Sequence, residues 1–360
     1  MTAQAKTDLL SLFPEEVRAK LTEMGEPAYR EQQIFSWLMK GKTYAEMKNL
    51  PLSLRQKLTD TCEWRIPTVQ AKQVSQADNT AKYLFRLADG ACVESVLMQY
   101  EYGYSLCISS QVGCRMGCRF CASTLGGKER DLLPSEMLGQ IIAAQAEAGV
   151  KVSHVVMMGI GEPLDNYAHV IRFLRLAAHP QRLGLSPRRI SLSTCGIVPR
   201  ILDLAEEELP VTLSVSLHAA SDEARSAIMP VNRTYPIGEL LSACRRFFER
   251  TGRRISFEYT LLSGVNDSEQ DAAALARTLR AGLGNMPVHV NLIRLNQVRE
   301  RQYVGASAAA AARFIAVLGR SGITATLRRR LGADIDAACG QLRRRAASAA
   351  EDAAPADPSC

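Results

Sequence analysis

The spacing of hydrophobic and polar residues divides the 360-residue chain into three successive patterns. Up to about residue 62, apolar residues recur at helical intervals between proline breakers. Helices are predicted to begin at Pro14, to span residues 29–40 and to span residues 52–61. We therefore predict a small helical domain over residues 1–66. The apolar face of its second helix consists of Ile34, Phe35, Trp37 and Leu38.

From residue 68 to residue 100, apolar and polar residues alternate instead. Residues 82–87 and 92–97 follow this period of two, and Asp89-Gly90 lies between them. An Asp-Gly pair between two alternating runs is a strong signal for a tight hairpin turn. We expect a β-hairpin extension over residues 67–100.

From residue 101 onward, short apolar runs alternate with longer helical stretches, as in strand–helix units on a parallel sheet. We predict an α/β fold, a partial (β/α)6 barrel of the TIM type, over residues 101–345. An alanine-rich helix is expected after residue 305, and a disordered tail is expected over residues 346–360. The predicted strands are 105–109, 152–158, 189–193, 211–217, 254–259, 288–293 and 324–328.

The amino-acid composition favours a globular protein over a membrane or secreted one. Hydrophobic residues make up 47% and charged residues 22%, which are ordinary globular values. No apolar run is long enough to span a bilayer, and acidic residues interrupt the start of the chain where a signal peptide would be apolar. We therefore expect a cytoplasmic protein without a membrane partner. In that reducing compartment the ten cysteines favour metal ligation, catalysis or core packing over structural disulfides.

The net charge of +7 comes from 44 Lys and Arg against 37 Asp and Glu. Arginine pairs recur after residue 180, among them Arg188-Arg189 and Arg245-Arg246. Such pairs can neutralise a nucleic-acid backbone, and they are equally common as solvated helix faces. Charge alone therefore leaves both interpretations open.

The first predicted barrel strand is followed by Cys114, Cys118 and Cys121, a CxxxCxxC loop without a fourth cysteine nearby. Thiolates favour iron–sulfur clusters, and three of them leave one iron of a [4Fe-4S] cluster open. An open iron can chelate the amino and carboxylate groups of a ligand. A zinc site would require a fourth protein ligand.

Polar residues also follow the other predicted strands, at the end where barrel enzymes place their reactive groups. After the second strand, Gly161 lets the backbone approach a ligand and Glu162 offers a carboxylate to an ammonium group. The remaining residues could bind ribose or adenine, although each one alone is more often a loop cap. They are Ser193, Ser216, Leu217, His218 and Asn296.

These motifs closely resemble the RlmN/Cfr family of radical S-adenosylmethionine RNA methyltransferases, over roughly residues 10 to 345. The resemblance implies that Cys114, Cys118 and Cys121 hold the cluster. It also implies that Gly161, Glu162, Ser193, Ser216, Leu217, His218 and Asn296 bind S-adenosylmethionine. The runs that carry it are QVGCRMGCRFCASTLGG, MGIGEPLDN, STCGIVP, SLHAASDEARSAIMPVNR, TGRRISFEYTLLSGVND and DIDAACGQL.

The resemblance further implies a methyl-carrying Cys339, a partner Cys107 and an acid–base role for Glu94. Adenine carbon 2 is too electron-poor to attack a methyl electrophile, so the methyl group must become the attacker. One S-adenosylmethionine would methylate Cys339, and cleavage of a second would yield a radical that activates this methyl group. Attack by Cys107 on the Cys339 sulfur would then release the RNA and leave a transient disulfide. An electron donor such as flavodoxin or ferredoxin is also implied.

The implied substrates are adenosine 2503 of 23S rRNA and adenosine 37 of tRNAs, methylated at carbon 2 by a monomeric enzyme whose helical domain binds RNA. One alternative is a Cfr-type enzyme acting on carbon 8, although Asp165-Asn166 after Glu162 favours carbon 2. The other is a non-catalytic, zinc-containing RNA-binding module. Two departures from the family pattern are Arg294, where proline is usual, and Cys195, which varies.

Overall fold

The computed structural model describes residues 6–295, 300–332 and 334–335. The predicted site residues Asn296 and Cys339 lie outside the described residues, as does the predicted tail 346–360. Every other predicted site residue can be placed.

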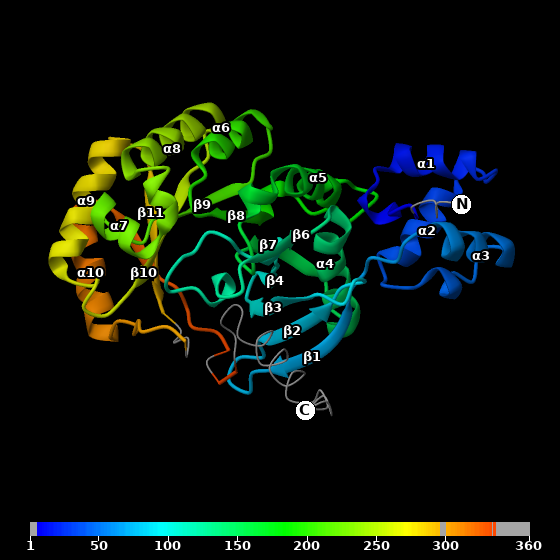
Figure 1. The fold of residues 1–360 in the computed structure, drawn as a ribbon, viewed down its shortest axis with the longest axis horizontal. Coiled ribbons are helices and arrows are strands. Elements are labelled where there is room, and N and C mark those ends of the chain that lie inside the picture. Colours follow the sequence, from blue (N-terminus) through cyan, green and yellow to red (C-terminus); the bar gives the residue numbers. More distant parts are fainter. Residues whose placement is uncertain (1–5, 296–299, 333, 336–360) are drawn as a thin grey trace, which may run out of the picture.

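The three predicted N-terminal helices are confirmed as α1 (Pro14–Glu23), α2 (Arg30–Leu38) and α3 (Leu52–Thr61), with short 3-10 helices η1 (Leu9–Ser11) and η2 (Tyr44–Glu46). Pro14 occupies the first position of α1, and Glu16 accepts a hydrogen bond of 2.6 Å from the Phe13 amide. The helices form a group at one end of the molecule (Figure 1).

A buried ion pair joins these helices to the rest of the protein. Glu31 of α2 accepts a hydrogen bond of 2.8 Å from Arg182, and both side chains are buried. The Arg182 guanidinium lies 3.2 Å from the centre of the Phe35 ring. The larger of two hydrophobic clusters contains buried residues from Leu9 to Ile323, so the helices and the barrel share this core.

The predicted hairpin is confirmed as β2 (Ala81–Arg86) and β3 (Cys92–Tyr100), which pair antiparallel from Ala81↔Leu97 to Arg86↔Cys92. The pattern did not separate a third strand, β1 (Thr68–Val74), which pairs with β2. Because β3 also pairs with β4 (Gly103–Cys107), the extension continues the sheet of the barrel.

The predicted α/β fold and its partial barrel are confirmed. All seven predicted strands are present, and each lies within two residues of its predicted bounds. Neighbouring strands are parallel in the order β4-β7-β8-β9-β10-β11-β12. The strands after β4 are β7 (Val152–Met157), β8 (Ile190–Thr194), β9 (Thr212–Ser216), β10 (Ile255–Leu261), β11 (Val288–Arg294) and β12 (Thr324–Leu327).

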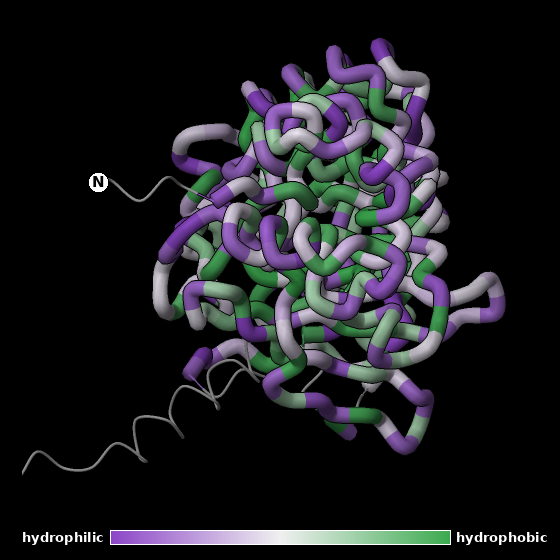
Figure 2. Tube along the Cα trace, turned by 90° about the vertical axis from the view of Figure 1, so that its right-hand side faces the viewer, coloured by the Kyte–Doolittle hydropathy of each residue, from purple (hydrophilic) through white to green (hydrophobic). Residues whose placement is uncertain are grey.

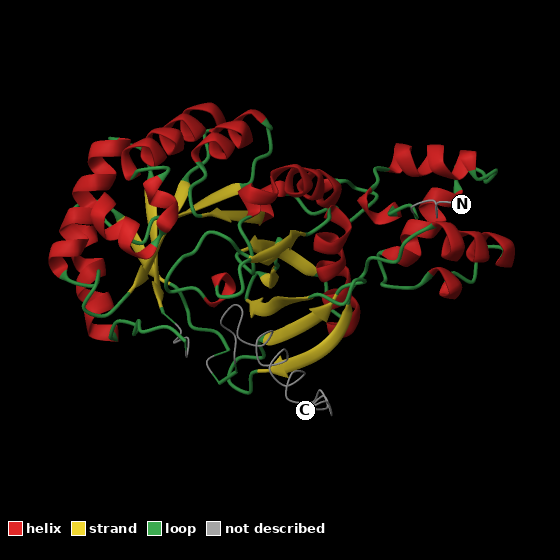
Figure 3. Ribbon diagram, viewed as in Figure 1, coloured by secondary structure: helices red, strands yellow, loops and turns green. Residues whose placement is uncertain are grey.

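Helices connect these strands and cover the outside of the sheet (Figure 3), while apolar residues concentrate inside (Figure 2). The expected alanine-rich helix is α10 (Ala308–Arg320). The others are α4 (Pro134–Ala148), α5 (Tyr167–Ala178), α6 (Val198–Glu206), α7 (Asp222–Ile228), α8 (Ile237–Thr251) and α9 (Glu269–Leu283).

The barrel does not close. In the described part of the chain, β12 ends the sheet and does not pair with β4, the first parallel strand. A separate small sheet, β5 (Gln111–Gly113) with β6 (Lys128–Asp131), flanks the cysteine loop, which contains the short helix η3 (Ala122–Thr124). Among the described residues, no helix is long and apolar enough to cross a membrane.

Candidate active site

The cysteine loop is held at its base by the antiparallel pair β5 and β6. The Cys114 amide donates a hydrogen bond of 2.8 Å to the Gly127 carbonyl and closes the loop. Gly113 has φ +77°, and a Cβ at this position would lie 2.0 Å from the Gly127 oxygen. Only glycine fits there, because both the dihedral angle and the contact exclude a side chain.

Asp165, from the motif after β7, holds the cysteine loop in place through three side chains at the loop and its two flanking strands. Its carboxylate accepts hydrogen bonds of 2.9 Å from Gln111 and from Lys128, and it also pairs with Arg115. Burial alone would raise the pKa of Asp165, but the hydrogen bonds from Arg115, Gln111 and Lys128 leave it below its usual value. The second motif therefore fixes the position of the first.

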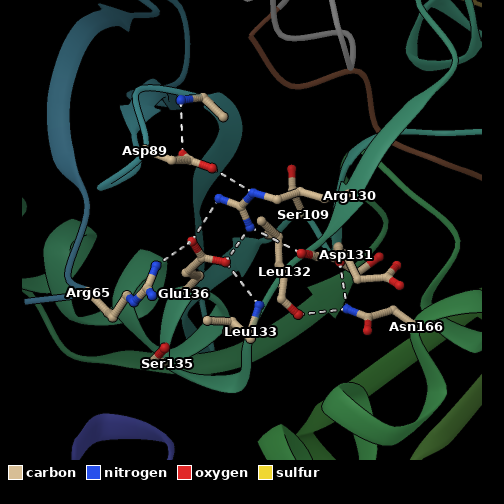
Figure 4. Close-up of polar contacts among 12 residues, drawn as sticks. Arg65, Asp89, Ser109, Arg130, Asp131, Leu132, Leu133, Ser135, Glu136 and Asn166 are labelled. Atoms are coloured by element: carbon tan, nitrogen blue, oxygen red, sulfur yellow. Dashed lines mark hydrogen bonds and ion pairs between the residues drawn. The ribbon is translucent and has the colours of Figure 1, made fainter. Parts of the chain in front are cut away.

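A polar network supports the other side of the loop (Figure 4). Asn166 donates hydrogen bonds of 2.9 Å to the Ser110 carbonyl and 2.8 Å to the Leu132 carbonyl. Arg130 of β6 makes two hydrogen bonds, of 2.8 and 2.9 Å, with Glu136 near the start of α4. Arg130 also donates 2.7 Å to Asp89, in the β2–β3 turn. The loop is thus tied to the hairpin and to α4.

A cavity of about 260 Å³, which we call the cofactor cavity, lies at the C-terminal ends of the barrel strands. The structure brings most of the predicted cluster and cofactor residues to its wall. Leu217 is an exception, because it is fully buried in the core and does not line the cavity. The predicted residues that line it are Cys114, Cys118, Cys121, Gly161, Glu162, Ser193, Ser216 and His218.

Glu162 is a buried carboxylate held by backbone amides. It accepts hydrogen bonds of 2.7 Å from the Cys195 amide and 3.0 Å from the Leu164 amide. Burial raises its pKa, and these hydrogen bonds partly oppose that shift. The preceding Gly161 has φ +111°, and a Cβ there would lie 2.7 Å from the Gln111 Cβ. The carboxylate is therefore fixed in a wall where it can meet an ammonium group.

His218 is neutral in the cavity wall. Its Nδ1 accepts a hydrogen bond of 2.9 Å from the Thr260 amide, so the ring proton belongs to Nε2. Burial, followed by the charge of Arg225, lowers the pKa of His218 to about 3. Its ring packs edge-on against Phe120 of the cysteine loop at 4.9 Å. His218 can therefore offer a hydrogen-bond donor and an apolar edge at neutral pH.

The three thiols fit an iron–sulfur cluster. Burial raises the pKa of Cys114 to about 12 and that of Cys118 further, so these thiols require a cationic partner to ionise. No three His, Cys, Asp or Glu side chains among the described residues are grouped to hold one metal ion. A four-iron cluster differs in this respect, because each thiolate binds its own iron.

A second cavity of about 250 Å³, the outer cavity, adjoins the first. The predicted partner Cys107 lines it beside Val96, its neighbour across β3 and β4. Burial raises the pKa of Cys107, and the charge of Arg328 opposes this shift. The two cavities share one wall, made of Phe120, Cys121, Met158, Thr260, Ile293 and Arg328.

Glu94 is buried on β3, two residues before Val96 and therefore on the same face of the strand. Its carboxylate lies 2.9 Å from the Lys82 ammonium, which is also buried. Glu94 does not line the outer cavity as far as the described residues define it. The sequence pattern missed Lys82, because alternation alone does not show that a strand lysine is buried.

Gly332 and Asp334, which precede Cys339 in the chain, are hydrogen-bonded to the turn between β1 and β2. The Gly332 amide donates 2.8 Å to Asp78, and Asp334 accepts hydrogen bonds of 2.5 Å from Ser75 and 2.8 Å from the Gln76 amide. These hydrogen bonds anchor residues that precede Cys339 by only a few positions.

Two further charged residues at the site were not predicted. Arg225 of α7 is fully buried and donates to the carbonyls of Cys195, Ser216 and Leu217 at 2.7, 3.0 and 3.1 Å. It therefore fixes the ends of β8 and β9. In sequence it resembles an ordinary helix-surface arginine, so no signal identified it.

The second is Glu258 of β10, which lines the cofactor cavity and accepts a hydrogen bond of 2.8 Å from Asn291. Burial raises its pKa. A carboxylate within the apolar run ISFEYTL was the available signal for Glu258.

Comparison with known families gives two matches. Residues 108–276 match the model of the radical SAM superfamily. Residues 7–64 match the model described as the ribosomal RNA large subunit methyltransferase N-terminal domain. The second match coincides with the helical N-terminal segment and the first with most of the barrel.

Known proteins resemble the chain over nearly its full length. A "Probable dual-specificity RNA methyltransferase RlmN" of Clostridium botulinum Eklund 17B is 46% identical over 94% of this chain and 96% of its own length. One with the same description from Pelotomaculum thermopropionicum is 49% identical over 91% of this chain and 89% of its own length. The crystal structure of a radical SAM methyltransferase from Sphaerobacter thermophilus has a TM-score of 0.89 and 42% identity, covering 93% of this chain and 98% of that one.

Proposed function

Because the chain belongs to the RlmN family of radical S-adenosylmethionine RNA methyltransferases, we propose that it methylates carbon 2 of adenosine. The proposed positions are adenosine 2503 of 23S rRNA and adenosine 37 of tRNAs. One observation supports this proposal most strongly: the cofactor cavity, with its three cysteines, shares a wall with the outer cavity, which contains Cys107. Radical generation and methyl transfer can thus occur in adjoining spaces.

In this proposal Cys114, Cys118 and Cys121 hold one [4Fe-4S] cluster, and the cofactor cavity holds S-adenosylmethionine, two molecules of which are used in each turnover. When bound and reduced, the cluster supplies the electron that cleaves S-adenosylmethionine to a 5'-deoxyadenosyl radical. Glu162 binds the ammonium group of the methionine moiety. The proposed ribose and adenine contacts are Gly161, Ser193, Ser216, Leu217, His218 and Asn296.

Leu217 has to contribute through its backbone, because its side chain lies in the core. Ser216 and His218 flank it and line the cavity. Arg225, which binds the Ser216 and Leu217 carbonyls, positions this segment. We assign Arg225 a positioning role for that reason.

Cys339 and Cys107 divide the methyl transfer between them. The Cys339 thiolate accepts a methyl group, and this sulfur is the covalent attachment point of the methylene that adds to adenine. Glu94 accepts the proton that leaves carbon 2, and the ion pair with Lys82 orients its carboxylate. Cys107 then attacks the Cys339 sulfur, which breaks the bond between that sulfur and the methylene carbon and forms a disulfide. The methylene carbon takes up a proton to become the methyl group of the product, and the one electron in excess would return to the cluster that Cys114, Cys118 and Cys121 would hold.

Turnover requires a thiol to reduce that disulfide and an electron donor such as flavodoxin or ferredoxin for the cluster. The eight described cysteines, which include Cys107, are free thiols, so Cys107 is in the reduced form that this cycle starts from.

We further propose that the enzyme acts as a monomer in the cytoplasm.

The purified protein, reconstituted anaerobically with iron, sulfide and reductant and supplied with S-adenosylmethionine, should convert adenosine in 23S rRNA fragments to 2-methyladenosine. Mass spectrometry of the digested RNA, compared with nucleoside standards, measures the product. Finding 8-methyladenosine would replace this assignment by the Cfr-type reaction. A colourless protein that binds zinc, remains without a cluster and leaves the RNA unmodified would favour a zinc-containing RNA-binding module.

A further inference from the structure

Four arginines lie on one side of the outer cavity. Arg328, Arg329 and Arg330 follow β12 directly, and Arg294 is the last residue of β11. We call them the arginine rim. They lie at the C-terminal ends of the last two strands, beside the gap where β12 does not pair with β4 in the described chain.

Strand register makes these arginines neighbours. Leu292 of β11 pairs with Leu327 of β12, and the ladder continues because the Arg328 amide donates 2.8 Å to the Leu292 carbonyl. Paired strands lie about 4.8 Å apart, so Arg294 leaves β11 next to the first residues after β12. The rim is therefore a compact group rather than a scattered set of surface charges.

The arginines differ in depth. Arg328 is partly buried, lines both cavities and contacts the Met158 sulfur at 3.7 Å. Arg294 is partly buried, and its Nε has no hydrogen-bond partner. Arg329 and Arg330 are exposed. Positive charge thus extends from the shared wall of the cavities to the molecular surface.

No acidic side chain balances this charge among the described residues that line the outer cavity. The cofactor does not explain the rim either, because S-adenosylmethionine carries a positive sulfonium and no phosphate. The charge of Arg328 does oppose the raised pKa of Glu258, which lines the cofactor cavity with it. On the side of the outer cavity the arginines face no carboxylate among the described lining residues, and Arg294 holds an unpaired buried donor, so this side suits a phosphate. The opposite wall supplies Val96, Met98 and Tyr100, which suit the face of a base.

Resting on the proposed RNA methyltransferase function, we propose that the arginine rim binds a backbone phosphate of RNA next to the nucleotide whose base enters the outer cavity. The base enters between Tyr100 and the shared wall, while its flanking phosphate stays at the rim. Arg328 and Arg294 contact the phosphate nearest the base, and Arg329 and Arg330 contact the next one outward.

The test measures RNA binding by fluorescence anisotropy with a labelled RNA hairpin that has an unpaired adenosine in its loop. Arg329→Gln/Arg330→Gln is compared with the wild type and with Arg245→Gln/Arg246→Gln. The control pair lies exposed on α8, in the outer helix layer. Both double variants remove two positive charges, so they differ only in position. Melting temperature and iron content verify that each variant is folded and loaded.

Loss of both arginine contacts to that outer phosphate should weaken binding about tenfold at low salt. It should also make the negative slope of log affinity against log salt less steep by about 0.7, the value for one phosphate of a single strand. The control should bind like the wild type. Equal weakening in both pairs, or an unchanged slope in the rim variant, would overturn the proposal. Competition by millimolar inorganic phosphate that is as strong as competition by unlabelled hairpin would also overturn it, because it would indicate a site for free anions.

Results with the wild-type protein distinguish a failure of the rim proposal from a failure of the proposed methyltransferase function. If it binds and methylates the hairpin while the rim variant binds equally well, the rim proposal fails and the function stands. If the wild type binds the hairpin but leaves it unmodified, the function fails. A weakened rim variant in that case still supports a phosphate site.

Discussion

At the scale of single residues, the position of Cys107 at the outer cavity suits its proposed role as the thiol that releases the RNA. It ends β4 and lines the outer cavity, whose shared wall with the cofactor cavity contains Cys121. Its pKa is raised by burial, which suits a thiol that has to stay unreactive until its target is close. A resolving cysteine with these properties should act late in the reaction.

Replacing Cys107 by alanine should therefore trap protein covalently joined to RNA, because the bond between Cys339 and the adenine can no longer be broken. Replacing Cys339 should prevent the crosslink from forming. Denaturing gel electrophoresis with radiolabelled RNA measures both variants. Equal amounts of crosslink in Cys107→Ala and Cys339→Ala would contradict the assigned division between the two cysteines.

His218 predicts a pH dependence of stability. The pKa of His218 is about 3 in the folded protein and about 6.5 in the unfolded chain, so between about pH 6.5 and pH 3 only the unfolded chain takes up this proton. Stability that is present above 6.5 should be lost by about 1.4 kcal/mol per pH unit as the pH falls towards 3. Urea unfolding at pH 7.5 and 5.5 should show a smaller pH effect in His218→Gln. An identical pH effect in both proteins would refute this assignment.

Residue types in motifs were the most predictable part of the site. Cys114, Glu162 and Ser216 could be assigned to one cavity because strand ends of a parallel barrel meet at one face. Arg225 and Lys82 could not be assigned, because the burial of a charge depends on partners that are distant in sequence. For Arg225 these partners are backbone carbonyls, which have no sequence signature.

At the scale of elements, strands with apolar runs were predicted within two residues, whereas short elements were missed. The small sheet of β5 and β6 spans only three and four residues, and its residues are largely polar or glycine. It is held by Asp165 and by Asn166, which come from a different motif. Its position therefore depends on tertiary contacts, not on local pattern.

This dependence gives a prediction for the cysteine loop. Asp165→Ala removes the acceptor of Gln111, Lys128 and Arg115 and should reduce the iron content after reconstitution several-fold. Asp203→Ala breaks an exposed Arg200 pair on α6 and serves as the control. Iron and sulfide analysis measures cluster occupancy. Equal occupancy in the two variants would show that Asp165 does not hold the loop.

At the scale of the whole molecule, the sheet is continuous from β1 to β12 and open between β4 and β12 in the described residues. The sequence pattern predicted the hairpin and the barrel strands, but it did not predict that they form one sheet. The pairing of β3 with β4 joins them, and this pairing has no local sequence signal. The gap matters for function, since the outer cavity extends from β3 and β4 to the ends of β11 and β12.

The buried pair of Glu31 and Arg182 fixes the N-terminal helices to this frame. Arg182→Met leaves the Glu31 carboxylate buried without its main partner and should cost about 3–5 kcal/mol of the free energy of unfolding. Glu31→Leu combined with Arg182→Met should recover most of that loss. Urea unfolding measures both. A double variant as unstable as Arg182→Met alone would show that packing, not charge, dominates this contact.

The radical route can be tested most directly through the hydrogens of the transferred methyl group. With S-adenosylmethionine that carries a trideuterated methyl group, the radical route removes one deuterium from the methyl group on Cys339 before it reaches adenine. We expect 2-methyladenosine that retains two deuterium atoms in its methyl group, as measured by mass spectrometry of the digested RNA. A product that retains all three would contradict this route, because the methyl group would then have been transferred intact.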